Sequence, residues 1–149
     1  MASPWPDLAG RLVEGGHVLP VRVYYENTDF TGIVYHAEYL KFFERGRSDF
    51  LRLCGVRHRE LAGEGDGFPE LAFTVRRLEI DYLKPAKIDD VLEVRTRMDE
   101  QRGARLVLIQ EIWRDDELLT SAKVLVVVIN VQGRPTRLPL TLAEQLKGR

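Results

Sequence analysis

The strongest constraint on the fold is a single helical pattern at 37–54, which stands between one strand-like segment and four others. Large apolar residues recur there at three- and four-residue spacing, and charged residues lie between them. The apolar positions are Leu40, Phe43, Phe50, Leu51 and Cys54. Because a lone amphipathic helix must bury its apolar stripe against another element, we expect this helix to pack on a sheet.

Two glycines indicate where this helix ends and where another element packs against it. Gly55 follows its last apolar position, where a left-handed C-terminal cap would fall. Gly46 lies inside it, at a cost of about 1 kcal/mol relative to alanine. We therefore predict that another element packs closely against the helix at Gly46.

The other segments have strand character. Apolar and β-branched residues are frequent in them, and turn-forming stretches such as "KPAKIDD" and "EQRGAR" separate them. The order is strand, long helix, then four consecutive antiparallel strands, which differs from the alternation of a parallel sheet. We expect an α+β fold with a five-stranded antiparallel sheet wrapped around one long central helix, followed by a short C-terminal helix capped by Thr141. The predicted strands cover 18–26, 70–82, 90–100, 104–114 and 118–131.

The length of 149 residues suits one domain with a substantial core. Residues 1–17 hold prolines, glycines and scattered charge, so they are predicted to form a flexible N-terminal arm. The single domain is then expected at 18–149.

Composition excludes several functional classes. The net charge of −1 gives no basic footprint for nucleic acid. Cys54 is the only cysteine, so an internal disulfide and a Cys-based zinc site are excluded, and the three histidines lack zinc-hydrolase spacing. The strongly apolar run at 124–131 is too short to span a membrane, and the first residues do not resemble a signal peptide. We expect a cytoplasmic protein without a metal or cofactor.

Candidate chemistry is concentrated in the segment "YYENTDFTGIVYH" at 24–36, between the first strand and the helix. Without further information, Asp29 suits a turn or helix start as well as it suits catalysis. Tyr25 alternates with Val21 and Val23, which fits an inward core tyrosine. His36 on its own fits a partly buried structural histidine.

This segment resembles the signature of the 4-hydroxybenzoyl-CoA thioesterase-like branch of the hotdog-fold superfamily. It is most similar to the bacterial acyl-CoA thioesterases associated with the Tol–Pal envelope system. The matching positions are Tyr25, Asp29, the "GIVY" run at 32–35 and His36. The later segments "DYLKPAKIDDVLEVRTRM" and "GARLVLIQEIW" extend the similarity to roughly 18–140. One departure is Asn27, at a position where many members carry a carboxylate. This replacement would loosen the turn or alter charge at the mouth of the site.

The resemblance implies hydrolysis of an acyl-CoA to a free acid and coenzyme A. Asp29 would act as nucleophile or as general base, two routes that the sequence leaves open. The main-chain amide of His36, at the start of the helix, would stabilise the oxyanion. Tyr25 and the His36 ring would hold Asp29, and substrate would contact Gly32, Val34 and Tyr35.

The resemblance also bears on assembly and partners. It implies a dimer or a dimer of dimers, the latter being a homotetramer, with the acyl–pantetheine channel at the subunit interface. It also implies an acyl-carrier-protein or envelope-system partner. Phe30, Phe68, Leu71 and Phe73 are candidates to line the acyl pocket. Two rival functions remain, an enoyl-thioester hydratase or dehydratase on the same fold and a non-catalytic acyl-CoA or carrier-protein binding module. Four basic residues are candidates for binding the coenzyme A phosphates: Arg76, Arg77, Lys84 and Lys87. The simpler interpretation is that they belong to the ordinary solvated surface.

Overall fold

The computed structural model describes residues 7–56 and 70–147. The α+β class and the single long helix predicted at 37–54 are confirmed, but the strand predicted at 18–26 ends at residue 22, and residues 25–27 form a 3-10 helix. The elements are β1 (Arg11–Val13), β2 (Gly16–Arg22), the 3-10 helix η1 (Tyr25–Asn27), α1 (Glu38–Leu53), β3 (Ala72–Tyr82), β4 (Val91–Arg102), β5 (Arg105–Arg114), β6 (Glu117–Ile129) and α3 (Leu140–Leu146).

The sheet has six strands in the order β1-β2-β4-β5-β6-β3, so the prediction of five strands was wrong. The additional strand is β1, which pairs with β2 in a register that sets Arg11 opposite Val18. Residues 11–17, predicted to belong to a flexible arm, therefore form a hairpin at the sheet edge. Residues 1–6 lie outside the described residues.

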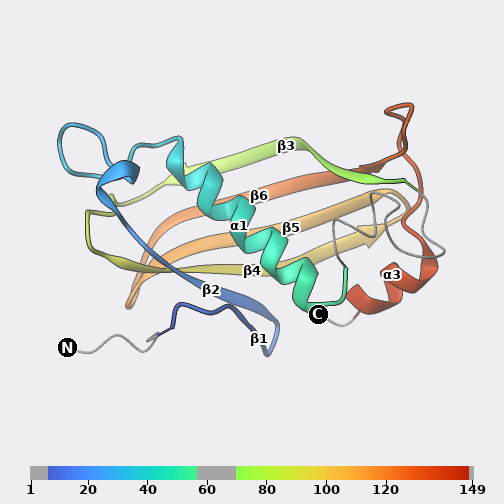
Figure 1. Cartoon of the computed structure of the whole chain (residues 1–149), viewed down its shortest axis with the longest axis horizontal. Helices are drawn as coiled ribbons and strands as arrows, with labels where there is room; N and C mark the ends of the chain where they lie inside the picture. Colours follow the sequence, from blue (N-terminus) through green and yellow to red (C-terminus); the bar gives the residue numbers. More distant parts are fainter. Residues whose placement is uncertain (1–6, 57–69, 148–149) are drawn as a thin grey trace.

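Strand β3 lies at the opposite edge, where it pairs with β6 and not with its successor β4. The connection at 83–90 therefore crosses the end of the sheet from the edge to its middle, whereas β4, β5 and β6 follow one another as antiparallel hairpins (Figure 1). This crossing brings the connection beside the segment that precedes α1.

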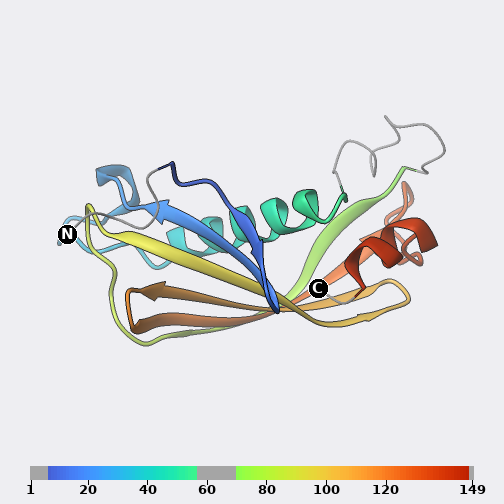
Figure 2. The same cartoon turned by 90° about the horizontal axis from the view of Figure 1, so that it is seen from below.

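Helix α1 lies along one face of the curved sheet, and Figure 2 shows it on that face in profile. It packs mainly against β1, β2 and β4. Phe43, Phe50, Leu51 and Cys54 of the predicted stripe are buried, but Leu40 is 41% exposed and was wrongly included. Tyr39 and Phe42 occupy the buried positions of that first turn.

The predicted cap at Gly55 is confirmed. Gly55 has φ +92°, its N–H donates to the carbonyl of Arg52 (3.0 Å), and the N–H of Val56 donates to that of Leu51 (2.8 Å). These two bonds satisfy carbonyls that the end of a helix leaves unpaired, and the left-handed conformation favours glycine. Val56 is fully buried, so the chain leaves the helix into the core.

The close packing predicted at Gly46 is also confirmed. A Cβ atom placed there would lie 2.7 Å from Val94 Cγ1 and 3.1 Å from both Gln110 Nε2 and Thr96 Oγ1. The helix backbone thus rests on the inner face of β4 and β5, which a larger residue would prevent.

His17 was predicted to belong to the arm, but it lies in β2 and is only 1% exposed. Its Nε2 lies 2.7 Å from Asp49 Oδ2 of α1, which ties the edge hairpin to the helix. Burial lowers the pKa of the imidazole despite the opposing effect of Asp49. No described residue partners the buried Nδ1, which agrees with a neutral ring, since a second N–H there would lack an acceptor.

Helix α3 covers one end of the sheet and buries Leu142 and Leu146. It starts at Leu140 after Pro139 and has no side-chain cap, so the predicted capping role of Thr141 was wrong. Within 7–56 and 70–147, neither helix has the length and apolar character required to cross a bilayer.

Candidate active site

The segment 28–36 forms a small loop that is held at both sides. Thr28 bridges Val34 across the loop, and the N–H of Asp29 donates to the carbonyl of Ile33 (2.9 Å). On the outer side, Val34 N–H donates to the carbonyl of Ala86 (2.9 Å). The crossing connection at 83–90 therefore supports the loop that leads into α1.

Asp29 lies in this loop with one carboxylate oxygen engaged. Oδ1 accepts hydrogen bonds from the N–H of Thr31 (2.7 Å) and from its hydroxyl. The hydroxyl, followed by the N–H, holds the pKa of Asp29 below its ordinary value of 3.8. The carboxylate is therefore ionised at neutral pH. The N–H of Ile33 lowers the pKa of Asp29 to a smaller extent, and the carboxylate is exposed, so it is open to a ligand.

The start of α1 supplies unpaired donors next to this loop. The N–H groups of Tyr35 and Glu38 are bonded to the carbonyls of Asn27 (3.0 Å) and Tyr35 (2.8 Å), respectively. Those of His36 and Ala37 donate to no acceptor within the described part of the chain. Such groups lie at the positive end of the helix dipole and can bind an anionic oxygen.

Two of the predicted catalytic side chains are exposed at the surface of the single chain. Tyr25 is 81% exposed, so the alternative of an inward core tyrosine was wrong. The His36 ring is exposed and contacts the rings of Tyr35 (4.6 Å between centroids) and Tyr82 (6.3 Å). Neither side chain hydrogen-bonds to Asp29 within the described residues, and their predicted role in holding Asp29 stays a prediction.

The predicted substrate-binding positions differ in exposure. Gly32 has φ +86°, which a side chain would strain, and its carbonyl accepts from Ile88 N–H (3.4 Å). Tyr35 is 48% exposed beside the His36 ring. Val34 is 4% exposed, so its side chain belongs to the core. Contact between these residues and a substrate stays a prediction.

Asn27 is buried below the loop and does not alter charge at the mouth of the site. Its Oδ1 accepts from Tyr24 N–H (2.7 Å), and its Nδ2 donates to Oε1 of Glu38 (3.3 Å). Glu38 is 9% exposed and pairs with Lys41 (3.0 Å). Lys41 is the largest cause that lowers the pKa of Glu38, and the bond from Asn27 adds to it. The neutral amide thus joins the loop to the first turn of α1.

Asn27→Asp is expected to lower the free energy of unfolding by about 1–3 kcal/mol at neutral pH, because it replaces a donor to Glu38 by a second carboxylate. The repulsion raises the folded-state pKa of the pair above the unfolded one. The loss is therefore full near neutral pH, shrinks as pH falls through the raised folded-state pKa, and is gone below about 4, where the carboxyls of the unfolded chain are protonated as well. Chemical denaturation of both proteins across this pH range measures it.

Asn130→Asp is the matched control. The Asn130 side chain only accepts, from the N–H groups of Gln132 (3.0 Å) and Arg134 (3.1 Å), and an aspartate can do the same. Equal stability losses for the two variants, or a loss in Asn27→Asp that persists at low pH, would contradict the role given to the Asn27–Glu38 bond.

The four candidate phosphate-binding residues differ in their surroundings. Arg77 pairs with Glu79 (2.8 Å) and Lys84 with Glu117 (3.1 Å). Arg76 lies in the β3 bulge, where Val75 and Arg77 flank a register shift. Lys87 lies in the bridge opposite Ile33, next to the Asp29 loop. Among these four, Lys87 is therefore the best placed for a ligand bound at Asp29.

Sequence reasoning missed three residues that shape the site. Thr31 fixes the Asp29 carboxylate, and the short "DFT" turn could have indicated it. The Tyr82 hydroxyl donates to the carbonyl of His36 (2.9 Å), and the Tyr39 hydroxyl accepts from Ala86 N–H (3.0 Å). These tyrosines come from β3 and α1, so only their tertiary contacts reveal them.

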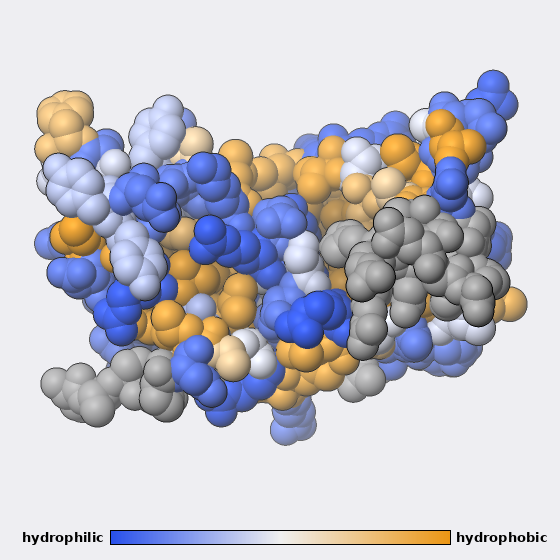
Figure 3. Space-filling model, viewed as in Figure 1, coloured by the Kyte–Doolittle hydropathy of each residue, from blue (hydrophilic) through white to orange (hydrophobic). Residues whose placement is uncertain are grey.

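A cavity lies between α1 and the inner face of β3, β5 and β6, on the side of the helix away from β2. Phe73, a predicted pocket residue, lines it together with Val75, Leu51 and Leu106. Leu71 is 8% exposed, Phe30 is fully exposed at the tip of the Asp29 loop, and Phe68 lies outside the described residues. Figure 3 shows hydrophobic residues (orange) at the surface between α1 and β3.

Comparisons with known proteins agree with this arrangement. The sequence profile of the thioesterase superfamily matches residues 31–121. The chain is 40% identical over 129 residues to acyl-CoA thioesterase YbgC of Haemophilus influenzae, covering 86% of this chain and 92% of that protein. It is also 40% identical over 130 residues to acyl-CoA thioester hydrolase YbgC of an Escherichia coli strain, covering 86% and 93%. Among solved structures, a probable thioesterase from Bartonella henselae has a TM-score of 0.79 and 46% identity, over 83% of this chain and 99% of that one.

Proposed function

The chain belongs to the thioesterase superfamily and is an acyl-CoA thioester hydrolase, and we propose that Asp29 carries its reaction. The observation that supports this assignment is the loop at 28–36. It presents an ionised, exposed carboxylate in the same short segment as the amides of His36 and Ala37, which have no acceptor among the described residues. A thioesterase requires these two elements, a nucleophile or base and a donor for the developing oxyanion.

In the proposed reaction, the amides of His36 and Ala37 donate to the thioester carbonyl oxygen as negative charge develops on it. Asp29 attacks the carbonyl carbon directly or removes a proton from the attacking water. The C–S bond then breaks, and the coenzyme A thiolate leaves and is protonated. In the direct route, water hydrolyses the resulting anhydride and regenerates the carboxylate.

The complete site is proposed to require a second copy of the chain. In the single chain, the carboxylate of Asp29 faces solvent. Strand β3 is the edge strand on one side of the sheet and is eleven residues long, whereas β1, the edge strand on the other side, has three residues. The outer edge of β3 is therefore the longer one available for pairing. Pairing of two β3 edges would cover exposed backbone groups and enclose the thioester. Assembly as a dimer or a dimer of dimers, a carrier-protein or envelope-system partner, cytoplasmic location and a single domain, extended to include the hairpin at 11–17, belong to this proposal.

Thiol release tests the proposed function. The purified protein is incubated with a panel of acyl-CoA thioesters, and free coenzyme A is followed with a disulfide reagent. Turnover with at least one member is expected. Conversion of a 2-enoyl-CoA to 3-hydroxyacyl-CoA without thiol release would favour the hydratase alternative. Binding of acyl-CoA without any turnover would favour the binding module.

A further inference from the structure

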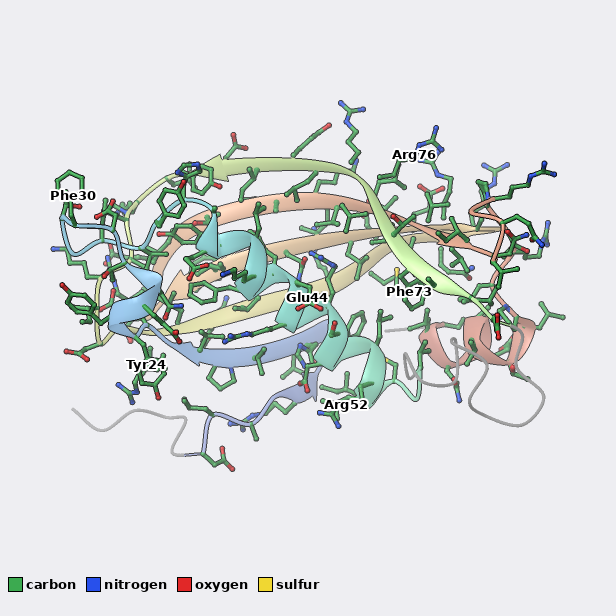
Figure 4. All side chains as sticks on the ribbon, turned by 45° about the horizontal axis from the view of Figure 1, so that its top comes forward. Tyr24, Phe30, Glu44, Arg52, Phe73 and Arg76 are labelled. Atoms are coloured by element: carbon green, nitrogen blue, oxygen red, sulfur yellow. The ribbon has the colours of Figure 1, made fainter. Side chains whose placement is uncertain are left out.

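The cavity beside α1 has an apolar wall and a charged wall. Its apolar lining comes from β3, β5, β6 and the end of the helix, through Leu51, Phe73, Val75, Leu106, Leu108 and Val126. The other wall is one face of α1, formed by Glu44, Arg47 and Ser48. In Figure 4, the labelled Glu44 on α1 and Phe73 on β3 lie on either side of this space.

Arg47 brings a cation into this cavity without a counter-ion in direct contact. Its guanidinium donates to Oε1 of Gln110 (3.0 Å), a neutral acceptor that is itself fully buried. Within the described residues, no carboxylate lies at ion-pair distance from it, and it makes no other hydrogen bond. Burial lowers the pKa of Arg47, which shows that the charge is partly desolvated. A guanidinium has five N–H donors, so most of them are available to a ligand.

The remaining polar groups do not neutralise this cation at short range. Glu44 lies one turn earlier on the same face and is exposed, and its carboxylate accepts from the hydroxyl of Ser48 (2.8 Å). It raises the pKa of Arg47 only by its more distant charge. Because solvent screens an exposed carboxylate more than it screens a half-buried guanidinium, Glu44 offsets the charge of Arg47 only in part.

The cavity and the proposed catalytic loop share two walls. Helix α1 extends from the amides of His36 and Ala37 to Arg47, a distance of about 15 Å along its axis at 1.5 Å per residue. Strand β3 carries Phe73 and Val75 at the cavity and Tyr82 at the carbonyl of His36. An acyl group bound to those amides and lying between α1 and β3 would therefore point toward the Arg47 guanidinium.

We propose that this cavity receives the far end of the acyl group and that Arg47 binds a carboxylate there, so that the enzyme prefers coenzyme A thioesters of dicarboxylic acids to those of the matching fatty acids. This assignment rests on the proposed function. A carboxylate matches the planar donor fork of arginine, and the pair forms charge-assisted hydrogen bonds. A methyl end would leave the half-buried guanidinium without a counter-ion.

Matched substrates test the proposal: adipyl-CoA against hexanoyl-CoA, suberyl-CoA against octanoyl-CoA, and sebacyl-CoA against decanoyl-CoA. For at least one pair, the wild-type kcat/KM is expected to favour the dicarboxylic thioester by about tenfold or more. Arg47→Met removes the charge at similar length and should abolish this ratio, and Arg47→Lys should retain part of it. The control Arg45→Met changes the neighbouring exposed arginine and should leave the ratio as in the wild type.

Each failure has a separate meaning. No thiol release from any substrate would overturn the proposed function. Calorimetry with free suberate and octanoate would still test the Arg47 site in that case, and it should show tighter binding of suberate that Arg47→Met removes. Equal kcat/KM within every pair, or a ratio unchanged in Arg47→Met, would overturn the assignment to Arg47. A change of oligomeric mass in folded Arg47→Met would also overturn it, because Arg47 would then be an interface residue.

Discussion

Asp29→Asn is expected to lower kcat for acyl-CoA hydrolysis at least about a hundredfold, the low end for loss of a catalytic acid or base. The substitution removes the negative charge that attacks the thioester or activates water, whichever route operates. It should leave the fold intact, since an asparagine oxygen can accept the same hydrogen bonds from Thr31 N–H and hydroxyl. Steady-state thiol release and a thermal unfolding curve, recorded on the same preparations, measure both effects.

Glu26→Gln is the matched control, because Glu26 is an exposed carboxylate of the neighbouring η1. Its kcat should equal that of the wild type. Near-native turnover in folded Asp29→Asn would remove Asp29 from the mechanism. After single-turnover hydrolysis in heavy-oxygen water, label in the Asp29 carboxylate would show direct attack, because only an anhydride whose aspartyl carbon is attacked by water takes up the label there.

Gly46→Val is expected to lower the free energy of unfolding by about 3 kcal/mol, the upper part of the range for overpacking a filled core. Even the Cβ atom would lie 2.7 Å from Val94 Cγ1, and the branched methyl groups have no open space between α1 and the sheet. Valine gains little helix propensity over glycine to offset this. Urea unfolding monitored by circular dichroism gives the difference.

Arg45→Val supplies the comparison, because Arg45 precedes Gly46 on the same helix and is exposed. Its stability should change by no more than about 0.5 kcal/mol, as for most surface substitutions. If Gly46→Val were as stable as Arg45→Val, the contact between helix and sheet at Gly46 would be looser than the structure shows.

The sequence indicated a candidate site, but it did not indicate the tertiary contacts around that site. The crowding of ionisable residues at 24–36 and the resemblance both led to Asp29 and the start of the helix. The fixing of Asp29 by Thr31 is a local turn and was within reach of sequence reasoning. The contacts of Tyr82 and Ala86 with this region join segments some fifty residues apart, and no local pattern indicates them.

The sequence also failed to predict which polar residues are buried in pairs. His17 was predicted to lie in an arm, but it pairs with Asp49 in the interior. Asn27 was predicted to loosen the turn or to alter charge at the mouth of the site, but it is buried and bonds to Glu38. Polar residues are usually exposed, so a buried one can be recognised only when its partner is known.

The sequence alone determined the α+β class, the bounds of α1, the close approach at Gly46, the left-handed turn at Gly55 and the segment that contains Asp29. These follow from periodicity and from the conformational freedom of glycine, both of which act over a few residues. The tertiary structure decided the strand order, the edge position of β3, the exposure of Tyr25 and the placement of Arg47 in a cavity with Phe73. These depend on which distant surfaces meet, because burial and pairing energies belong to the contact and not to either segment.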